Sequence, residues 1–342
     1  MPKGGAHFTS EELDEVIGCY ELGQIRNLKP LSAGNRRAPK MIIYTQKGTF
    51  LLKRRSPGKN DLYHVAFTHA VQTHLAEKSF LLPSIITTKN QNNTMLRLNG
   101  HIYELFEFIT GTRYNGSPAE TLDAGKQLAK CHLYIADFSS DFPPLKGTFH
   151  DAAVVRHKLK TTGSAKSDKK DNKLCKISDT LMRLYNQSSI RVNQLGFDNW
   201  KQQVIHADWH PGNMLFDKNK LVAVLDFDSI RIAPPVVDLA NAMLQFSIVG
   251  NRPNPADWPA YLDQAKLIQL LNGYRQIIEP RKNQLLSLPD LMIETMIAEA
   301  ILPVAAAGSF ANLEGTPFLK MIHRKTKWMN SHRRKLLNAI NA

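Results

Sequence analysis

The first hundred residues alternate between apolar and polar positions in short runs, a pattern that predicts a mostly antiparallel β-sheet. Strands are expected at residues 41–44, 50–53, 84–88, 94–98 and 102–109. The turns at Lys47-Gly48 and Asn99-Gly100 are typical of hairpin connections. Residues 61–78 instead place apolar side chains at helical spacing, so one helix is expected within the sheet region. A short helical segment is expected from Glu11.

After Gly111 the pattern becomes mainly helical, which predicts a second lobe of different architecture. Helices are expected at residues 118–138, 177–195 and 285–307, and short strands at 204–205, 214–216 and 221–225. The segment 158–176 is rich in lysine and poor in apolar side chains, which predicts a flexible basic insertion. We therefore expect an α+β fold with an N-lobe at residues 1–106 and a C-lobe at residues 107–342.

The formal net charge of +14 is concentrated in two basic segments, residues 158–176 and 324–335. Neither segment has the interleaved aromatic side chains of a base-stacking platform, so a nucleic-acid partner is not expected. The three cysteines are far apart and form no CxxC pair, which is typical of a reducing cytoplasm. We expect no signal peptide, because residues 1–14 lack an apolar stretch, and no membrane span, because prolines and acids interrupt residues 285–307.

One polar loop between apolar strands carries the candidate chemistry. It holds His206, Asp208 and Asn213, and Asp226 follows thirteen residues later at the end of the next apolar run. Phosphoryl transfer uses an aspartate to orient the attacking hydroxyl and accept its proton, and an amide oxygen and a carboxylate to hold Mg²⁺. We therefore predict Asp208 as the catalytic base and Asn213 and Asp226 as the metal ligands. His206 is expected to orient the catalytic loop.

The motifs HADWHPGN (residues 206–213) and LDFDS (residues 225–229) resemble the aminoglycoside phosphotransferase and choline kinase family. The resemblance implies a two-lobe protein-kinase-like fold that uses ATP and Mg²⁺. Ala207 stands where glycine is commoner in the family's pattern. The resemblance also implies that Asp238, in the segment PPVVDLA, is structural and braces the catalytic loop.

The same resemblance implies a set of nucleotide-binding residues in the N-lobe. They are Lys53, the turn residues Ser32, Gly34 and Asn35, and Glu107 and Phe108, whose backbone groups would bind adenine. Kinase-like folds pair the lysine with a helix glutamate, but the helix at 61–78 has only Glu77 near its end. Either Glu77 serves despite its late position or the pair is absent, and we favour its absence.

By resemblance, the acceptor is a hydroxyl of a small molecule such as homoserine, choline or ethanolamine, an amino sugar or an aminoglycoside. Trp209, Asp228 and Arg231 are expected to border its site, and Arg231 could bind a carboxylate. Glu294 and Glu299 either face a cationic acceptor or lie on a solvated helix face. Two alternatives stay open, namely a protein Ser/Thr kinase and a non-catalytic, spore-coat-like or nucleotide-binding structural protein. A monomer and a homodimer are equally compatible with the sequence.

Overall fold

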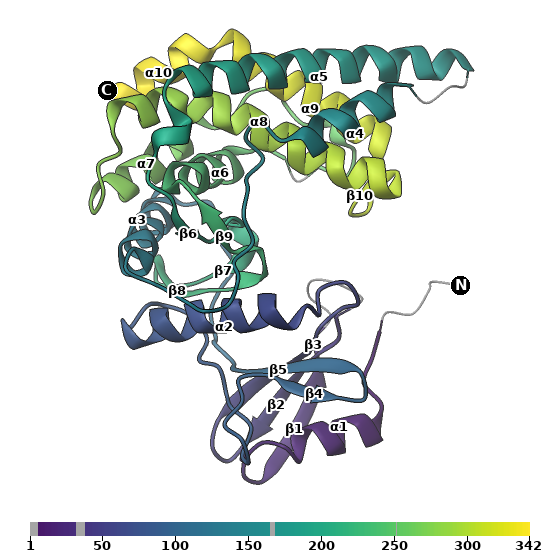
Figure 1. Cartoon of the computed structure of the whole chain (residues 1–342), viewed down its shortest axis with the longest axis vertical. Coiled ribbons are helices and arrows are strands. Elements are labelled where there is room, and N and C mark those ends of the chain that lie inside the picture. The colour runs from purple at the N-terminus through teal and green to yellow at the C-terminus, as the bar shows by residue number, and fades with distance from the viewer. Residues whose placement is uncertain (1–5, 32–37, 165–167, 251) are drawn as a thin grey trace. The chain divides into compact units, whose positions relative to one another are not determined.

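The computed structural model describes residues 6–31, 38–164, 168–250 and 252–342, and the chain forms two compact units (Figure 1). Unit 1 comprises residues 1–113, 137–145 and 214–228, and unit 2 comprises residues 114–136, 146–213 and 229–342. These units differ from the predicted lobes because a hairpin far along the chain belongs to unit 1. Thr112 and Phe216 exchange backbone hydrogen bonds of 2.8 and 2.9 Å, and Val224 N–H donates to the Leu81 carbonyl at 2.8 Å.

Unit 1 is built on a five-stranded antiparallel sheet with the strand order β1-β2-β3-β5-β4. The strands are β1 (Ile25–Pro30), β2 (Lys40–Thr45), β3 (Thr49–Arg54), β4 (Leu96–Leu98) and β5 (His101–Glu107), and the helices are α1 (Ser10–Ile17) and α2 (Leu62–Glu77). The hairpin from the later part of the chain that belongs to unit 1 consists of β7 (Met214–Asp217) and β8 (Lys220–Val224). The predicted antiparallel sheet with one inserted helix is thus confirmed, although β1 was not predicted.

The register of the sheet separates an apolar face from a charged row. Ile43, Leu52 and Leu105 are fully buried in one core with residues of α1. Because successive side chains point to opposite faces, Lys53 lies on the face opposite Leu52. Lys53 is directly opposite Lys40 of β2 and Glu104 of β5, so these three charged residues form a row across the sheet.

The strand predicted at residues 84–88 is wrong, because only Ile85 forms an isolated bridge, to Phe106. Along one edge, β5 has two different neighbours, β4 and the segment around Ile85. Its first residues, 101–103, pair with β4, which leaves only the end of β5 for the segment around Ile85.

Unit 2 is mainly helical, as predicted. Its helices are α3 (Pro118–Ile135), α4 (Ala153–Ser164), α5 (Asp168–Gln194), α6 (Pro235–Ser247), α7 (Gln264–Arg275), α8 (Lys282–Ala307), α9 (Gly315–Ser331) and α10 (Arg333–Asn341). Short strand pairs are formed by β6 (Gln203–Ile205) with β9 (Arg231–Ala233) and by β10 (Ser309–Phe310) with β11 (Leu313–Glu314). Of the helices that the structure describes, none combines the length and apolar character that a membrane span requires.

The flexibility of the basic insertion stays a prediction, but the described residues within it are helical: residues 158–164 belong to α4 and residues 168–176 belong to α5. The two helices pack against each other, and Val155 and Leu159 of α4 are buried, as are Ile177 and Leu181 of α5. Each of these pairs is spaced four residues apart, which places both members on one helix face. The many lysines between the two pairs hid this helical spacing in the sequence.

Helices α3 and α7 approach each other so closely that glycine is required on both. A Cβ at Gly125 would lie 1.9 Å from the Leu270 carbonyl oxygen, and a Cβ at Gly273 would lie 1.9 Å from the Leu122 carbonyl oxygen. This reciprocal contact brings Tyr274 of α7 next to α3. Tyr274 thereby takes part in supporting the loop after β6.

Candidate active site

The loop after β6 is held by one carboxylate of α6. Asp238, which is fully buried, accepts the His206 N–H at 2.9 Å and the Ala207 N–H at 3.0 Å. The prediction that Asp238 braces this loop is confirmed. Ala207 adopts a φ of 61°, in the left-handed region where glycine has no steric penalty. This conformation gives a physical reason for glycine in the related motif and strains the alanine found here.

A histidine of α3 supports Asp238 in turn. His132 Nε2 lies 3.1 Å from the Asp238 carboxylate, and its Nδ1 lies 2.8 Å from the Tyr274 hydroxyl. Because a carboxylate accepts, Nε2 of a neutral ring donates and Nδ1 accepts the hydroxyl hydrogen. The close packing of α3 against α7 thus supports the catalytic loop through the side chains of His132 and Tyr274.

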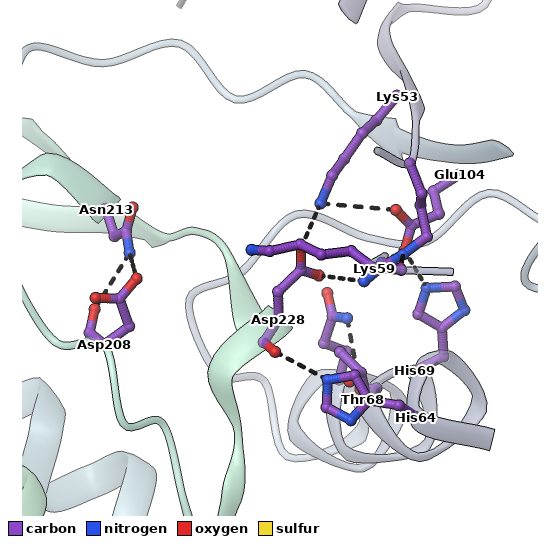
Figure 2. Close-up of polar contacts among 11 residues, drawn as sticks. Lys53, Lys59, His64, Thr68, His69, Glu104, Asp208, Asn213 and Asp228 are labelled. Carbon is purple, nitrogen blue, oxygen red and sulfur yellow. Dashed lines mark hydrogen bonds and ion pairs between the residues drawn. The ribbon is translucent and has the colours of Figure 1, made fainter. Parts of the chain in front are cut away.

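The carboxylate of Asp208 is fixed by residues of its own loop. Asn213 Nδ2 donates to Oδ2 of Asp208 at 3.0 Å and to its backbone carbonyl at 3.2 Å (Figure 2). His210 Nε2 lies 3.5 Å from Oδ1 of Asp208, while its Nδ1 accepts the Gly212 N–H at 3.0 Å. This bond places the proton of a neutral His210 ring on Nε2, facing Asp208. This role of His210 was not predicted from the sequence, although its spacing of two residues from Asp208 pointed to it.

These contacts control the charge of Asp208. Burial alone would raise the pKa of its carboxyl, but the hydrogen bond and charge of His210 oppose that effect. The charge of His206 and the hydrogen bond from Asn213 act in the same direction, and the net pKa is lowered. Asp208 is therefore ionised at neutral pH and can accept a hydrogen bond from a hydroxyl group.

The side chains of His206 and Trp209 are fully buried, and their rings meet edge to face with centroids 5.5 Å apart. His206 Nδ1 also accepts the backbone N–H of Asp208 at 3.3 Å. His206 thus contacts the backbone of its own loop, and its role in orienting the loop stays a prediction. Trp209, which was predicted to border an acceptor site, has its indole enclosed in the core of unit 2.

In unit 1, Lys53 lies in a buried cluster of ion pairs (Figure 2). Its Nζ lies 3.1 Å from the Asp228 carboxylate and 3.7 Å from the Glu104 carboxylate. Arg55 bridges the same two acids, at 2.6 Å from Glu104 and 2.9 Å from Asp228. Among the described residues, the acidic partners of Lys53 come from β5 and from the segment after β8 rather than from α2.

Helix α2 contributes histidines to this cluster instead of a glutamate. His69 Nε2 donates to Glu104 at 2.8 Å, and His64 Nε2 donates to the Asp228 carbonyl at 2.9 Å. Glu77 is exposed at the end of the helix. Sequence reasoning therefore missed His64, His69 and Glu104, and the alternation of Tyr103-Glu104-Leu105 on β5 was the available signal for the last of them.

The charge of Glu104 is set by opposing effects. Burial would raise the pKa of Glu104, but the charge of Lys53, the hydrogen bond from His69 and the charge of Arg55 outweigh it and lower the pKa to about 2. The pKa of Lys53 is raised, because Glu104, Asp228 and Asp226 outweigh the effect of its burial. At neutral pH, Lys53 and Glu104 are therefore both ionised.

Asp228, which was predicted to border the acceptor site, has its carboxylate engaged by Lys53 and Arg55 in unit 1, and its acceptor role stays a prediction. Asp226 precedes it with a φ of 59°, a left-handed conformation that turns the chain at this point. Lys40 also lies near these acids. Burial and the charge of Lys53 lower the pKa of Lys40, and the charges of Asp226 and Asp228 oppose them.

The predicted adenine-binding groups are only partly available. The N–H of Glu107 donates to the Ser84 carbonyl and that of Phe108 to the Thr49 carbonyl, both at 2.9 Å. These two donors are thus occupied within unit 1, and β5 extends to Glu107, one residue beyond the predicted N-lobe boundary. Ser32, Gly34 and Asn35 lie outside the described residues.

Comparison with known proteins assigns the chain to a family. Residues 27–278 match the family model described as the phosphotransferase enzyme family. The chain belongs to this phosphotransferase family. The resemblance inferred from the two motifs is thus confirmed, and the matched range includes Lys53, Asp208 and Asp226.

Curated relatives of this phosphotransferase-family chain are homoserine kinases. The one from Bradyrhizobium diazoefficiens is 26% identical over 233 residues, which cover 64% of this chain and 63% of the relative. The one from Rhodopseudomonas palustris is 23% identical over 221 residues, with the same coverage of both chains. The matched part is therefore less than two thirds of the length of these relatives.

Solved structures of low identity confirm the α+β, protein-kinase-like fold. The amicoumacin kinase hAmiN, in complex with AMP-PNP, Ca²⁺ and Ami, has a TM-score of 0.70 at 13% identity and covers 95% of this chain and 94% of its own. A microcompartment-associated aminopropanol kinase has a TM-score of 0.70 at 12% identity, with coverages of 94% and 97%.

Proposed function

We propose that this phosphotransferase-family protein is an ATP- and Mg²⁺-dependent kinase that phosphorylates a hydroxyl of a small metabolite. The observation that carries the proposal is the fixed, ionised carboxylate of Asp208, held by Asn213 and His210 in a braced loop. The relatives named homoserine kinase and the neighbour named aminopropanol kinase support a small hydroxyl acceptor. The neighbour in complex with AMP-PNP and Ca²⁺ supports a nucleotide and a divalent cation.

In the proposed reaction, Asp208 orients the acceptor hydroxyl and takes its proton. The hydroxyl oxygen forms a bond to the γ-phosphorus of ATP, and the bond between that phosphorus and the β–γ bridging oxygen breaks. ADP leaves with the electron pair of the broken bond. Catalysis of this kind comes from positioning and charge stabilisation, and a well-placed base contributes ~10²–10⁴-fold to the rate.

Asn213 and Asp226 fit the role of ligands for a divalent cation. The amide nitrogen of Asn213 is used by Asp208, which leaves its amide oxygen as a hard ligand, and Asp226 supplies a carboxylate. Oxygen donors of this kind are the ones that Mg²⁺ prefers. A bound Mg²⁺ would neutralise negative charge on the phosphates.

Unit 1 supplies the groups for the nucleotide in this proposal. Asp228 and Glu104 fix the position of the Lys53 ammonium group, which would bind a phosphate oxygen. Lys40 lies beside it in the sheet register and adds a second positive charge. Two neighbouring lysines on one sheet face repel each other, and an anionic ligand would relieve that repulsion.

The test is an ADP-release assay across amino acids, amino alcohols, amino sugars and aminoglycosides, paired with equilibrium binding of Mg-ATP. In the Asp208→Asn variant, kcat is expected to fall ~10²–10⁴-fold, while the affinity for Mg-ATP stays near that of the unchanged protein. Asp217→Asn, an exposed change on β7, serves as the control and is expected to keep full turnover. Full turnover by Asp208→Asn would show that Asp208 is not the catalytic base. Failure of the protein to bind Mg-ATP would overturn the kinase assignment.

A further inference from the structure

Unit 2 contains a cavity of about 240 Å³ whose lining residues belong to none of the predicted nucleotide, metal and acceptor sites. Helices α3, α6 and α7, the start of α8 and the segment leading into β6 contribute to its lining. The apolar part of the lining includes Val236, Leu239 and Ile278. The volume corresponds to roughly eight groups of the size of water, so the cavity can hold a small organic molecule.

The lining includes a buried hydrogen-bond donor that the protein does not use. Trp200, which precedes β6, is 5% exposed, and its indole Nε1 has no hydrogen-bond partner in the described part of the chain. An indole N–H can only donate. Because an unpaired buried donor opposes folding, an oxygen acceptor supplied by a ligand would stabilise this group.

The exposed end of the cavity carries positive charge. Lys201 and Arg281 both line the cavity and are exposed, and neither is paired with a carboxylate of the described residues. The one acid in the lining, Glu279, is already paired with Arg275 at 3.2 Å. Two cationic side chains are therefore left to balance a negative charge brought by a ligand.

The first turns of two helices add to this positive charge. Val236 at the start of α6 and Gln284 at the start of α8 line the cavity, and a helix N-terminus carries a partial positive charge. The first turn of α8 has no acidic residue, and Asp238 in the first turn of α6 is engaged by the catalytic loop. The cavity therefore favours an anion over a neutral or cationic molecule.

The same cavity is lined by the two side chains that support the catalytic loop. The Tyr274 hydroxyl lies 2.8 Å from His132 Nδ1, and His132 Nε2 lies 3.1 Å from the Asp238 carboxylate. Gln203, also in the lining, donates to the His132 carbonyl at 2.8 Å. A molecule in the cavity would therefore contact the residues that hold Asp238 in place.

We propose that this cavity binds a small organic carboxylate and that the bound molecule stabilises the catalytic loop. The carboxylate accepts a hydrogen bond from the Trp200 indole and lies near Lys201 and Arg281, while its apolar body packs against side chains of α6. A ligand that binds only when Tyr274 and His132 are in place shifts the population of the loop toward its braced arrangement. The inference goes beyond the proposed kinase function, and its test does not depend on that function.

Hexanoate is the probe, because its size matches the cavity, and it is compared with neutral hexanamide and cationic hexylammonium. Selective ¹⁵N labelling gives one indole N–H signal for each of the four tryptophans, and Trp200→Phe identifies that of Trp200. Hexanoate is expected to shift this signal saturably, with a Kd on the order of 1–10 mM. Hexanamide should bind at least ~10-fold more weakly and hexylammonium should not bind. Sodium chloride is the ionic-strength control.

Charge variants test the anion-binding end of the cavity. The double variant Lys201→Gln with Arg281→Gln is expected to weaken hexanoate binding ~10-fold, because it removes both cations, and to leave hexanamide binding unchanged. Lys282→Gln is the matched control, since Lys282 is an exposed cation beside Arg281 that does not line the cavity. Equal weakening in the double variant and the control would overturn the proposed site. Absence of a saturable Trp200 shift, or equal affinities for hexanoate and hexanamide, would do the same.

The indole signal of Trp209 tests the link to the catalytic loop. Trp209 belongs to that loop, and its ring lies 5.5 Å from that of His206, between centroids. Hexanoate is expected to shift the Trp209 signal with the same concentration dependence as that of Trp200. Tyr274→Phe, which lacks the hydroxyl bonded to His132, should keep the Trp200 shift and reduce the Trp209 shift. A Trp209 signal that hexanoate leaves unchanged in the unaltered protein would overturn the proposed stabilisation of the loop.

Discussion

The ammonium group of Lys53 on β3 lies 3.7 Å from the carboxylate of Glu104, the residue directly opposite it on β5. The acid that kinase-like folds take from a helix is thus provided here by a strand neighbour in the sheet register. Helix α2 takes part through His69, which donates to Glu104. The helix thereby keeps a connection to the lysine without contributing an acid.

Glu104→Gln is expected to lower the free energy of unfolding by about 3–5 kcal/mol, because Arg55 and Lys53 would remain charged and buried with one acid fewer. Urea unfolding measures the change. Glu107→Gln is the matched control on the same strand, since Glu107 is exposed and its carboxylate accepts from the Ser84 hydroxyl, and its effect should stay within about 0.5 kcal/mol. A change below about 1 kcal/mol for Glu104→Gln would contradict the role of this acid.

Glu104 also predicts how stability depends on pH. Its folded pKa of about 2 lies below its ordinary value of 4.5, so its contribution is complete above about pH 4.5 and is lost as the pH falls toward 2. We expect the unfolding free energy of the unchanged protein to fall with decreasing pH over this interval. In Glu104→Gln the fall should be smaller, and an identical slope in both proteins would argue against the lowered pKa.

Asp238→Asn is expected to impair the catalytic loop. The new amide can accept with only one oxygen, so either the His206 or the Ala207 N–H would lose its partner in a fully buried place. We expect a loss of about 1–3 kcal/mol of stability and at least a ~10-fold fall in kcat, with Mg-ATP affinity retained. Steady-state kinetics and urea unfolding test this, and an unchanged kcat would show that the loop does not need the brace.

Ala207→Gly is expected to stabilise the protein by up to ~1 kcal/mol, because the φ of 61° is strained for alanine and free of strain for glycine. The same substitution at Ala66, in the interior of α2, is the control and should destabilise by about 1 kcal/mol. Thermal and urea unfolding measure both changes. Destabilisation at both positions would mean that the loop conformation at residue 207 differs from the one described.

Gly125→Ala is expected to destabilise the protein by about 3 kcal/mol or more, since its Cβ would lie 1.9 Å from a backbone oxygen of α7. The separation of α3 from α7 should also move Tyr274 away from His132, so kcat should fall together with stability. Gly163→Ala on α4 is the control, because its nearest neighbour would be the Ser178 Cβ at 3.2 Å. Its effect should stay below about 1 kcal/mol. Equal effects at the two glycines would contradict the close approach of α3 and α7.

The sequence by itself determined the elements whose signal is local. The hairpin turns, the helix over α2 and the order of His206, Asp208 and Asn213 were readable, because period, turn chemistry and motif spacing are properties of neighbouring residues. Family membership followed from the same motifs. Helix α4 escaped prediction because its buried residues Val155 and Leu159 are outweighed in composition by lysines nearby.

Only the tertiary structure decided which distant residues share a charge network. Lys53 and Asp228 are 175 residues apart, and His132 and Asp238 are 106 apart, so no local pattern joins them. Asp228 and Trp209 were predicted as acceptor residues because they lie beside the predicted catalytic positions in the sequence; only the structure showed that Asp228 is bound by Lys53 and that Trp209 is enclosed in the core. Glu104 was overlooked for a related reason: a strand acid gains its partners from sheet register and burial, and both of these arise only when the chain folds.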